Sequence, residues 1–158
     1  MYNIVKTIPL FIKSMADCDY SYDIYFRMAV IEEYQKENKK IWDLYQKMQQ
    51  IRCNQNPVIP IYMINHKNEY CELIQSIEKE GYNYNYPILI NKDYLIIDGA
   101  HRMACALYFN CPTISIIQEQ KDIIPNEYTK EWFINNHLSE CIPYAEHQKR
   151  LVRSRYHV

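Results

Sequence analysis

Glycine and long apolar runs are scarce in this sequence. The chain of 158 residues contains two glycines, and its longest apolar runs have only the length of a β-strand. A helix that crosses a bilayer needs about 20 consecutive apolar residues, so we expect no transmembrane helix. The apolar N-terminal stretch lacks both a basic cluster and a small-residue cleavage site. It therefore does not resemble a secretory signal peptide.

Cysteine pairs and an excess of one charge sign are also missing. The six cysteines include no C-x-x-C pair and no spacing typical of a zinc site. We expect buried, reduced thiols in a cytoplasmic protein. The formal net charge of −1 provides no overall attraction to nucleic acid.

The residues that are present predict a folded α/β domain. Hydrophobic residues make up 48% of the chain and charged residues 23%, which excludes general disorder. Apolar residues recur at helical spacing in residues 22–52, with a polar break at 36–40 that divides the region into two helices. These stripes are explained by core packing. Further helices are expected at 69–79, 127–136 and 139–152, and strands at 59–64, 87–91, 94–97 and 113–117.

The most informative segment is YLIIDGAHRMACALYF, residues 94–109. An apolar strand ends on Asp98, Gly99 allows a tight turn, and His101 and Arg102 fall in the first turn of the next helix. The N–H groups that begin a helix favour a bound anion. The turn therefore predicts a phosphate site, with Asp98 available for a metal ion. The alternative is that Asp98 caps the helix and the two basic residues face solvent.

The Asp-Gly-Ala-His-Arg turn, preceded by Pro-Ile-Leu-Ile-Asn at 87–91, resembles the ParB/sulfiredoxin superfamily. It is most similar to the branch of the free-serine kinases, whose turn reads Asp-Gly-His-His-Arg. The resemblance covers residues 59–117. It implies one α/β (α+β) domain, residues 1–158. The ParB/sulfiredoxin-like mixed-sheet core (57–118) would follow a helical N-terminal extension (1–56) and precede C-terminal helices (119–158).

Departures from these relatives narrow the expected chemistry. Ala100 stands where sulfiredoxins carry their reactive cysteine and where ParB proteins carry a glutamate. Redox chemistry of the sulfiredoxin type therefore lacks its nucleophile. About forty residues follow the core, which we expect to be too few for the DNA-binding and dimerisation segments of ParB. Ala100 also replaces a histidine of the kinase branch, so one polar contact is missing.

The resemblance implies roles for individual residues. Asp98 would bind Mg²⁺ or orient the acceptor hydroxyl, while Gly99, Ala100, His101 and Arg102 would surround the phosphates of ATP, or of ADP or CTP. Asp98 and His101 are thus candidate catalytic residues. The kinases also use an upstream glutamate as a base, and Glu69 is the better match here. The alternatives are Glu72 in that role and an ordinary helix-face charge for either glutamate, with His66 equally ambiguous.

Three functions remain open from the sequence. The first is a kinase that phosphorylates a hydroxyl of a small molecule or glycan, since the chain also looks similar to uncharacterised proteins of bacterial surface-polysaccharide gene clusters. The second is a ParB-like nucleotide switch or hydrolase without a phosphoryl acceptor. The third, a nucleic-acid-binding module, is disfavoured by the near-neutral charge.

The C-terminal segment is basic. It places Lys149, Arg150, Arg153 and Arg155 within seven residues. Such a run is usually a solvated face, and the alternative is attraction to an anionic substrate or membrane surface. With a lipid-linked glycan as acceptor, the protein would lie at the inner face of the membrane.

Overall fold

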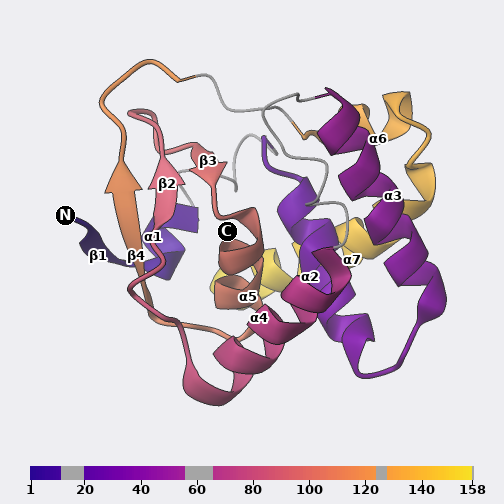
Figure 1. Ribbon diagram of the computed structural model, residues 1–158, viewed down its shortest axis with the longest axis horizontal. Coiled ribbons are helices and arrows are strands. Elements are labelled where there is room, and N and C mark those ends of the chain that lie inside the picture. The colour runs from indigo at the N-terminus through magenta and orange to yellow at the C-terminus, as the bar shows by residue number, and fades with distance from the viewer. Residues whose placement is uncertain (12–19, 56–65, 124–127, 158) are drawn as a thin grey trace.

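A four-stranded mixed sheet forms one side of the part of the chain that the computed structural model describes, residues 1–11, 20–55, 66–123 and 128–157 (Figure 1). Its spatial order is β1 (Asn3–Lys6), β4 (Thr113–Gln118), β2 (Ile88–Ile90), β3 (Ile96–Asp98). β1 pairs with β4 and β2 with β3 in antiparallel fashion, whereas β2 and β4 are parallel. The expected mixed α/β class is therefore confirmed.

The β2–β3 hairpin was predicted from local sequence, and its turn explains why. The Asn91 side-chain oxygen accepts hydrogen bonds from the backbone N–H groups of Asp93 (3.0 Å) and Leu95 (2.9 Å). Tyr94 adopts a left-handed φ of 66°. An asparagine that bonds to the backbone two residues ahead replaces part of the turn's own hydrogen bonding. The hairpin thus delivers Asp98 to the end of β3.

The structure also has helices in the regions where the sequence predicts them, with somewhat different ends. The predicted break at 36–40 separates α2 from α3, and the expected helix at 69–79 is longer than its apolar pattern. The expected strand at 59–64 lies outside the described residues. The helices are α1 (Thr7–Phe11), α2 (Asp23–Tyr34), α3 (Lys39–Gln55), α4 (His66–Glu80), α5 (Ala100–Tyr108), α6 (Lys130–Asn135), the 3₁₀ turn η3 (Ser139–Cys141) and α7 (Ile142–Tyr156).

Strand β1 is a feature that the sequence analysis did not predict. It pairs along the edge of the sheet with β4, Asn3 opposite Ile116 and Lys6 opposite Thr113. The next residue secures this pairing, because the Thr7 hydroxyl donates to the carbonyl of Cys111 at 2.6 Å. A pairing between segments so distant in sequence leaves no local periodicity to detect.

The core centres on α2 and α5. Helix α5 leaves the sheet and packs against α2 and α4, while α2 also packs against α7 (Figure 1). Residues 103–107 of α5 are fully buried, as their apolar pattern predicted, and Phe109 is half-buried. This packing fixes the start of α5, and with it His101 and Arg102, relative to α3 and α4.

The same core holds a buried ion pair. Asp23 and Arg27, one turn apart on α2, are in contact with 2% and 0% of their side chains exposed. The Gln49 side-chain oxygen accepts hydrogen bonds from Arg27 (3.0 Å) and from Arg52 (2.7 Å). A buried charge is tolerated when it is paired and hydrogen-bonded, and this network meets both conditions through both terminal nitrogens of Arg27, although its buried Nε has no partner among the described residues.

The described cysteines are free thiols, in agreement with the sequence prediction. Cys53, Cys105, Cys111 and Cys141 are buried, and Cys71 is half-buried. Burial raises the pKa of the Cys105 thiol far above its usual range. A buried protonated thiol is a poor nucleophile.

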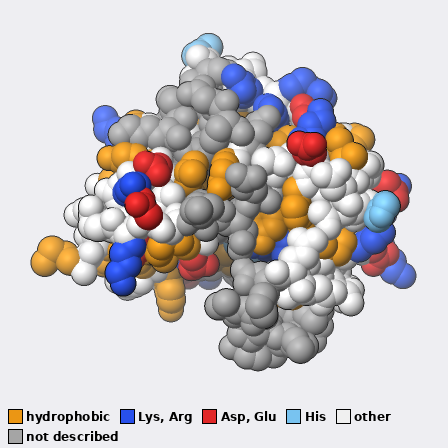
Figure 2. All heavy atoms as spheres, turned by 90° about the horizontal axis from the view of Figure 1, so that it is seen from above, with side chains coloured by type: hydrophobic (Ala, Val, Ile, Leu, Met, Phe, Trp, Pro, Cys, Tyr) orange, Lys and Arg blue, Asp and Glu red, His pale blue; other side chains and the backbone are white. Residues whose placement is uncertain are grey.

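The surface shows no dominant charge on the face drawn in Figure 2, where acidic and basic side chains of the described residues are interspersed. Of the four C-terminal basic residues, Lys149 lies 5.9 Å from the Tyr22 ring and Arg155 donates to the Asn110 side chain at 2.9 Å. At least these two contact the protein itself. Within the described segments, no helix is both long and apolar enough to span a bilayer.

Candidate functional site

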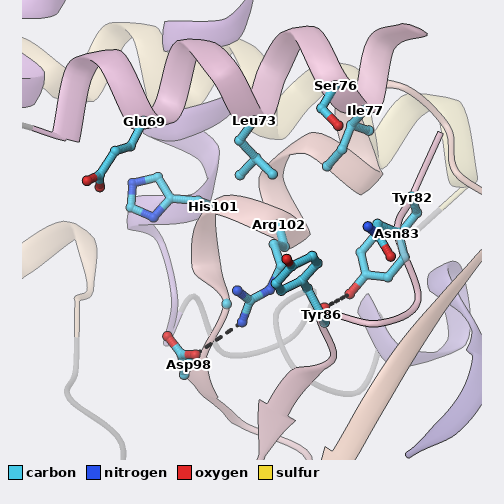
Figure 3. A pocket seen from close by; sticks show the side chains of 11 residues that line it. Glu69, Leu73, Ser76, Ile77, Tyr82, Asn83, Tyr86, Asp98, His101 and Arg102 are labelled. Atoms are coloured by element: carbon cyan, nitrogen blue, oxygen red, sulfur yellow. Dashed lines mark hydrogen bonds and ion pairs between the residues drawn. The ribbon is translucent and has the colours of Figure 1, made fainter. Parts of the chain in front are cut away.

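A pocket of about 370 Å³ lies where α4, the 82–86 loop and the start of α5 meet (Figure 3). It brings together five residues predicted from sequence, which are Glu69, Asp98, Gly99, His101 and Arg102. The remaining lining residues are Leu73, Ser76, Ile77, Tyr82, Asn83 and Tyr86. Ala100, the remaining residue of the predicted turn, does not line it.

The turn between β3 and α5 has the predicted geometry. β3 ends at Asp98, Gly99 is the N-cap residue with φ 101° and ψ 22°, and the helix begins at Ala100. No side chain caps the helix start. The alternative in which Asp98 caps the helix is therefore wrong for this structure. The first helical N–H groups thus form an anion-favouring end beside the pocket.

Asp98 is instead paired with Arg102. One guanidinium nitrogen, Nη2, lies 3.1 Å from the Asp98 carboxylate and 3.1 Å from the carbonyl oxygen of Pro87 (Figure 3). The Asp98 side chain is 74% exposed and that of Arg102 is 24% exposed. The buried Nε of Arg102 has no hydrogen-bond partner among the described residues. Arg102 is therefore held in place while part of its donor capacity is unused.

Gly99 lets the guanidinium lie against the turn. A Cβ atom added there would stand 2.9 Å from Nη2 of Arg102 and 3.1 Å from Ile88. Only glycine combines a left-handed φ with this close approach at low cost. The glycine thus shapes the part of the pocket where α5 begins.

A left-handed alanine costs about 1–2 kcal/mol by itself. Because the added Cβ would also crowd Arg102 and Ile88, Gly99→Ala is expected to lower the free energy of unfolding by more than that. The matched control is Gly81→Ala, because Gly81 has a φ of 81° and nothing within 4 Å of the added Cβ. Urea unfolding of both variants measures the difference. Equal losses would show that the Arg102 contact carries no energetic weight.

His101 is held by two tyrosines. Its Nε2 lies 2.7 Å from the Tyr45 hydroxyl, and its ring meets the Tyr70 ring edge-on at 4.7 Å between centroids. Tyr45 comes from α3 and Tyr70 from α4. The sequence analysis placed Tyr45 only in an apolar stripe. No local signal links Tyr45 to a histidine 56 residues away.

The structure distinguishes the two candidate glutamates. Glu69 lies in the first turn of α4 and lines the pocket beside His101 (Figure 3). Glu72 is exposed and is not among the lining residues. The side chain of His66 lies outside the described residues. Glu69 is therefore the carboxylate that the fold places at this site.

The opposite end of the pocket is aromatic, and the sequence analysis missed it. The Tyr82 hydroxyl donates to the carbonyl oxygen of Tyr86 at 2.8 Å, which fixes the loop between them. The Tyr86 side chain is 62% exposed, and Leu73 and Ile77 supply apolar surface from α4. Aromatic faces of this kind accept flat rings by stacking. The pocket wall therefore combines charged groups with aromatic and apolar surface.

The described residues form no site that binds a metal ion by protein ligands alone. No group of three His, Cys, Asp or Glu side chains comes together among them. Mg²⁺, however, commonly binds through one or two carboxylates together with substrate phosphates and water. The exposed carboxylate of Asp98 fits that second mode and does not fit a permanent metal centre.

Comparison of the chain with protein-family models, with curated proteins and with solved structures gives no match.

Proposed function

We propose that this protein is a nucleotide-dependent kinase that phosphorylates a hydroxyl group, built on a ParB/sulfiredoxin-like core. The observation that carries the proposal is the pocket itself. It is lined by Glu69, Asp98, His101 and Arg102 beside an uncapped helix start, and Tyr82 and Tyr86 add an aromatic surface to its wall. Phosphoryl transfer depends mainly on positioning and charge neutralisation, and this arrangement offers both.

The phosphates of ATP, or of ADP or CTP, fit the end formed by Gly99 and Arg102. The backbone N–H groups that begin α5 and the guanidinium of Arg102, which lines the pocket, are the donors at this end. The base fits against the aromatic wall formed by Tyr82 and Tyr86, which Figure 3 shows on the side of Arg102 away from Glu69. Bound Mg²⁺ would neutralise phosphate charge, and Asp98 is the carboxylate placed to hold it.

The acceptor hydroxyl fits beside Glu69. A carboxylate there accepts the hydroxyl proton as the hydroxyl attacks the terminal phosphorus, and the bond from phosphorus to the nucleotide oxygen breaks. A small molecule or a glycan of the surface-polysaccharide type, lipid-linked or free, is the acceptor class we propose. Such a role places the protein in the cytoplasm, at or near the inner face of the membrane.

Isothermal titration calorimetry with ATP, ADP and CTP in the presence of Mg²⁺ tests the first step, and mass spectrometry after incubation with candidate acceptors tests the second. Nucleotide binding together with a phosphorylated acceptor supports the kinase. If the protein binds or hydrolyses the nucleotide but transfers phosphate to none of the candidate acceptors, the nucleotide-switch function is favoured instead. Absence of nucleotide binding by the wild-type protein would refute both.

Arg102→Ala is expected to weaken nucleotide binding by about 1.5–3 kcal/mol, because it removes a charge-assisted contact to phosphate. The control is Arg150→Ala, which removes an exposed arginine on α7 that does not line the pocket. Calorimetry on both variants, with melting curves to confirm folding, measures the effect. An affinity of the Arg102 variant equal to that of wild type would remove Arg102 from the proposed phosphate site.

A further inference from the structure

The hydrogen bond between Tyr45 and His101 has a defined direction. Tyr45 is 1% exposed, and its hydroxyl lies 2.7 Å from Nε2 of His101. Among the described residues, Nε2 is the one hydrogen-bond partner of this hydroxyl. A buried hydroxyl must place its own hydrogen on an acceptor. The Tyr45 hydroxyl therefore donates, and Nε2 of His101 accepts.

The residues around this hydrogen bond keep Tyr45 as its donor and restrict rotation of the His101 ring. Burial raises the pKa of the Tyr45 phenol far above its usual range, so the phenol stays protonated and remains a donor. The Tyr70 ring stacks on the Tyr45 ring at 5.4 Å and meets the His101 ring edge-on at 4.7 Å. The imidazole therefore has little freedom to flip and exchange its two nitrogens.

We propose that Tyr45 is a positioning residue that fixes neutral His101 as the tautomer with its proton on Nδ1. The nitrogen on which the proton lies is set by the hydrogen bond that the other nitrogen makes. The charged groups nearest this ring in the pocket are Glu69 on α4 and the pair of Asp98 and Arg102 at the start of α5 (Figure 3). In this site the second nitrogen of His101 is a hydrogen-bond donor and has no lone pair to offer.

The consequence for chemistry rests on the proposed function. A neutral histidine with its proton on Nδ1 and its Nε2 lone pair engaged by Tyr45 does not take a proton from a hydroxyl. The role of base then belongs to Glu69. The site thus depends on α3, a helix from the region predicted to be an N-terminal extension of the core.

The inference is tested by long-range ¹H–¹⁵N NMR of the imidazole rings at about pH 8.5, two units above the ordinary histidine pKa of about 6.5. His101→Gln identifies the His101 signals by their loss. We expect wild-type His101 to carry its proton on Nδ1. In Tyr45→Phe we expect that preference to be lost, with signals of the Nε2–H form appearing.

Tyr70→Phe is the matched control. It also removes one buried tyrosine hydroxyl, but that hydroxyl donates to the backbone carbonyl of Arg27 at 2.8 Å and not to His101. A purely structural effect would appear in both variants, whereas a positioning effect appears in Tyr45→Phe alone. Wild-type His101 protonated on Nε2, or the same tautomer in wild type and Tyr45→Phe, would overturn the inference. The wild-type spectrum decides the tautomer even if Tyr45→Phe fails to fold.

Two further measurements test this inference separately from the proposed function. Titration of the wild-type protein with Mg-ATP should shift the Nδ1 signal of His101, and Tyr45→Phe should lower phosphoryl transfer on the order of tenfold, a typical loss when an orienting partner of a functional histidine is removed. A correct tautomer with no response to nucleotide would contradict the kinase proposal and leave the position of the proton established. Transfer unchanged in Tyr45→Phe despite a changed tautomer would contradict the role of Tyr45 in the site.

Discussion

Arg27→Met is expected to destabilise the protein by about 3–5 kcal/mol, because it leaves the carboxylate of Asp23 buried without its partner. Both side chains are almost completely inaccessible, at 2% for Asp23 and 0% for Arg27. The Gln49 oxygen would also lose one of its two hydrogen-bond donors. Proteins of this size are stable by only about 5–15 kcal/mol, so the loss is a large part of the total.

Urea unfolding measures this effect, and two further variants show its origin. Lys36→Met breaks the exposed pair with Glu33, in which the lysine side chain is 63% exposed, so we expect little change. The double variant Asp23→Leu with Arg27→Met removes both buried charges, and we expect it to recover much of the lost stability. A loss below about 1 kcal/mol in Arg27→Met would show that the buried pair is not needed.

Local signals made much of the site predictable. A β-hairpin followed by a glycine turn and a helix needs only neighbouring residues, and the sequence around Asn91 and Gly99 carries the required turn chemistry. The same holds for the polar break between α2 and α3, where the Asn38 side chain accepts from the backbone N–H of Ile41. Such features follow from φ, ψ and hydrogen bonding over a few residues.

Contacts between distant segments explain what was missed. The Tyr45 hydroxyl meets His101 across 56 residues, and β1 pairs with β4 across more than 100 residues. In an apolar helical stripe, a tyrosine that packs and a tyrosine that also bonds to a site residue look the same. The pairing of Asp98 with Arg102 is a different case, because its i,i+4 spacing was visible. The sequence analysis weighed only capping and ligand binding for Asp98.

Asp98 is therefore the residue whose structural and chemical roles most need separation. In the structure its carboxylate contacts Arg102 at 3.1 Å, and it is 74% exposed. An exposed ion pair contributes about 0–1 kcal/mol, so the fold does not depend on it. Under the proposed function, by contrast, the negative charge of Asp98 holds Mg²⁺ or orients the hydroxyl, and no neutral residue supplies that charge.

Asp98→Asn is expected to melt within about 2–4 °C of wild type, retain some nucleotide binding and lose phosphoryl transfer by about 100-fold or more. The asparagine oxygen still accepts from Arg102 but carries no charge. The control is Asp93→Asn, the same chemical change at an exposed position in the hairpin turn that does not line the pocket. Melting curves, calorimetry and transfer of labelled phosphate from ATP are measured on both variants. If Asp98→Asn transfers phosphate as fast as wild type, Asp98 serves only as the partner of Arg102, and the nucleotide-switch function becomes the better explanation of the pocket.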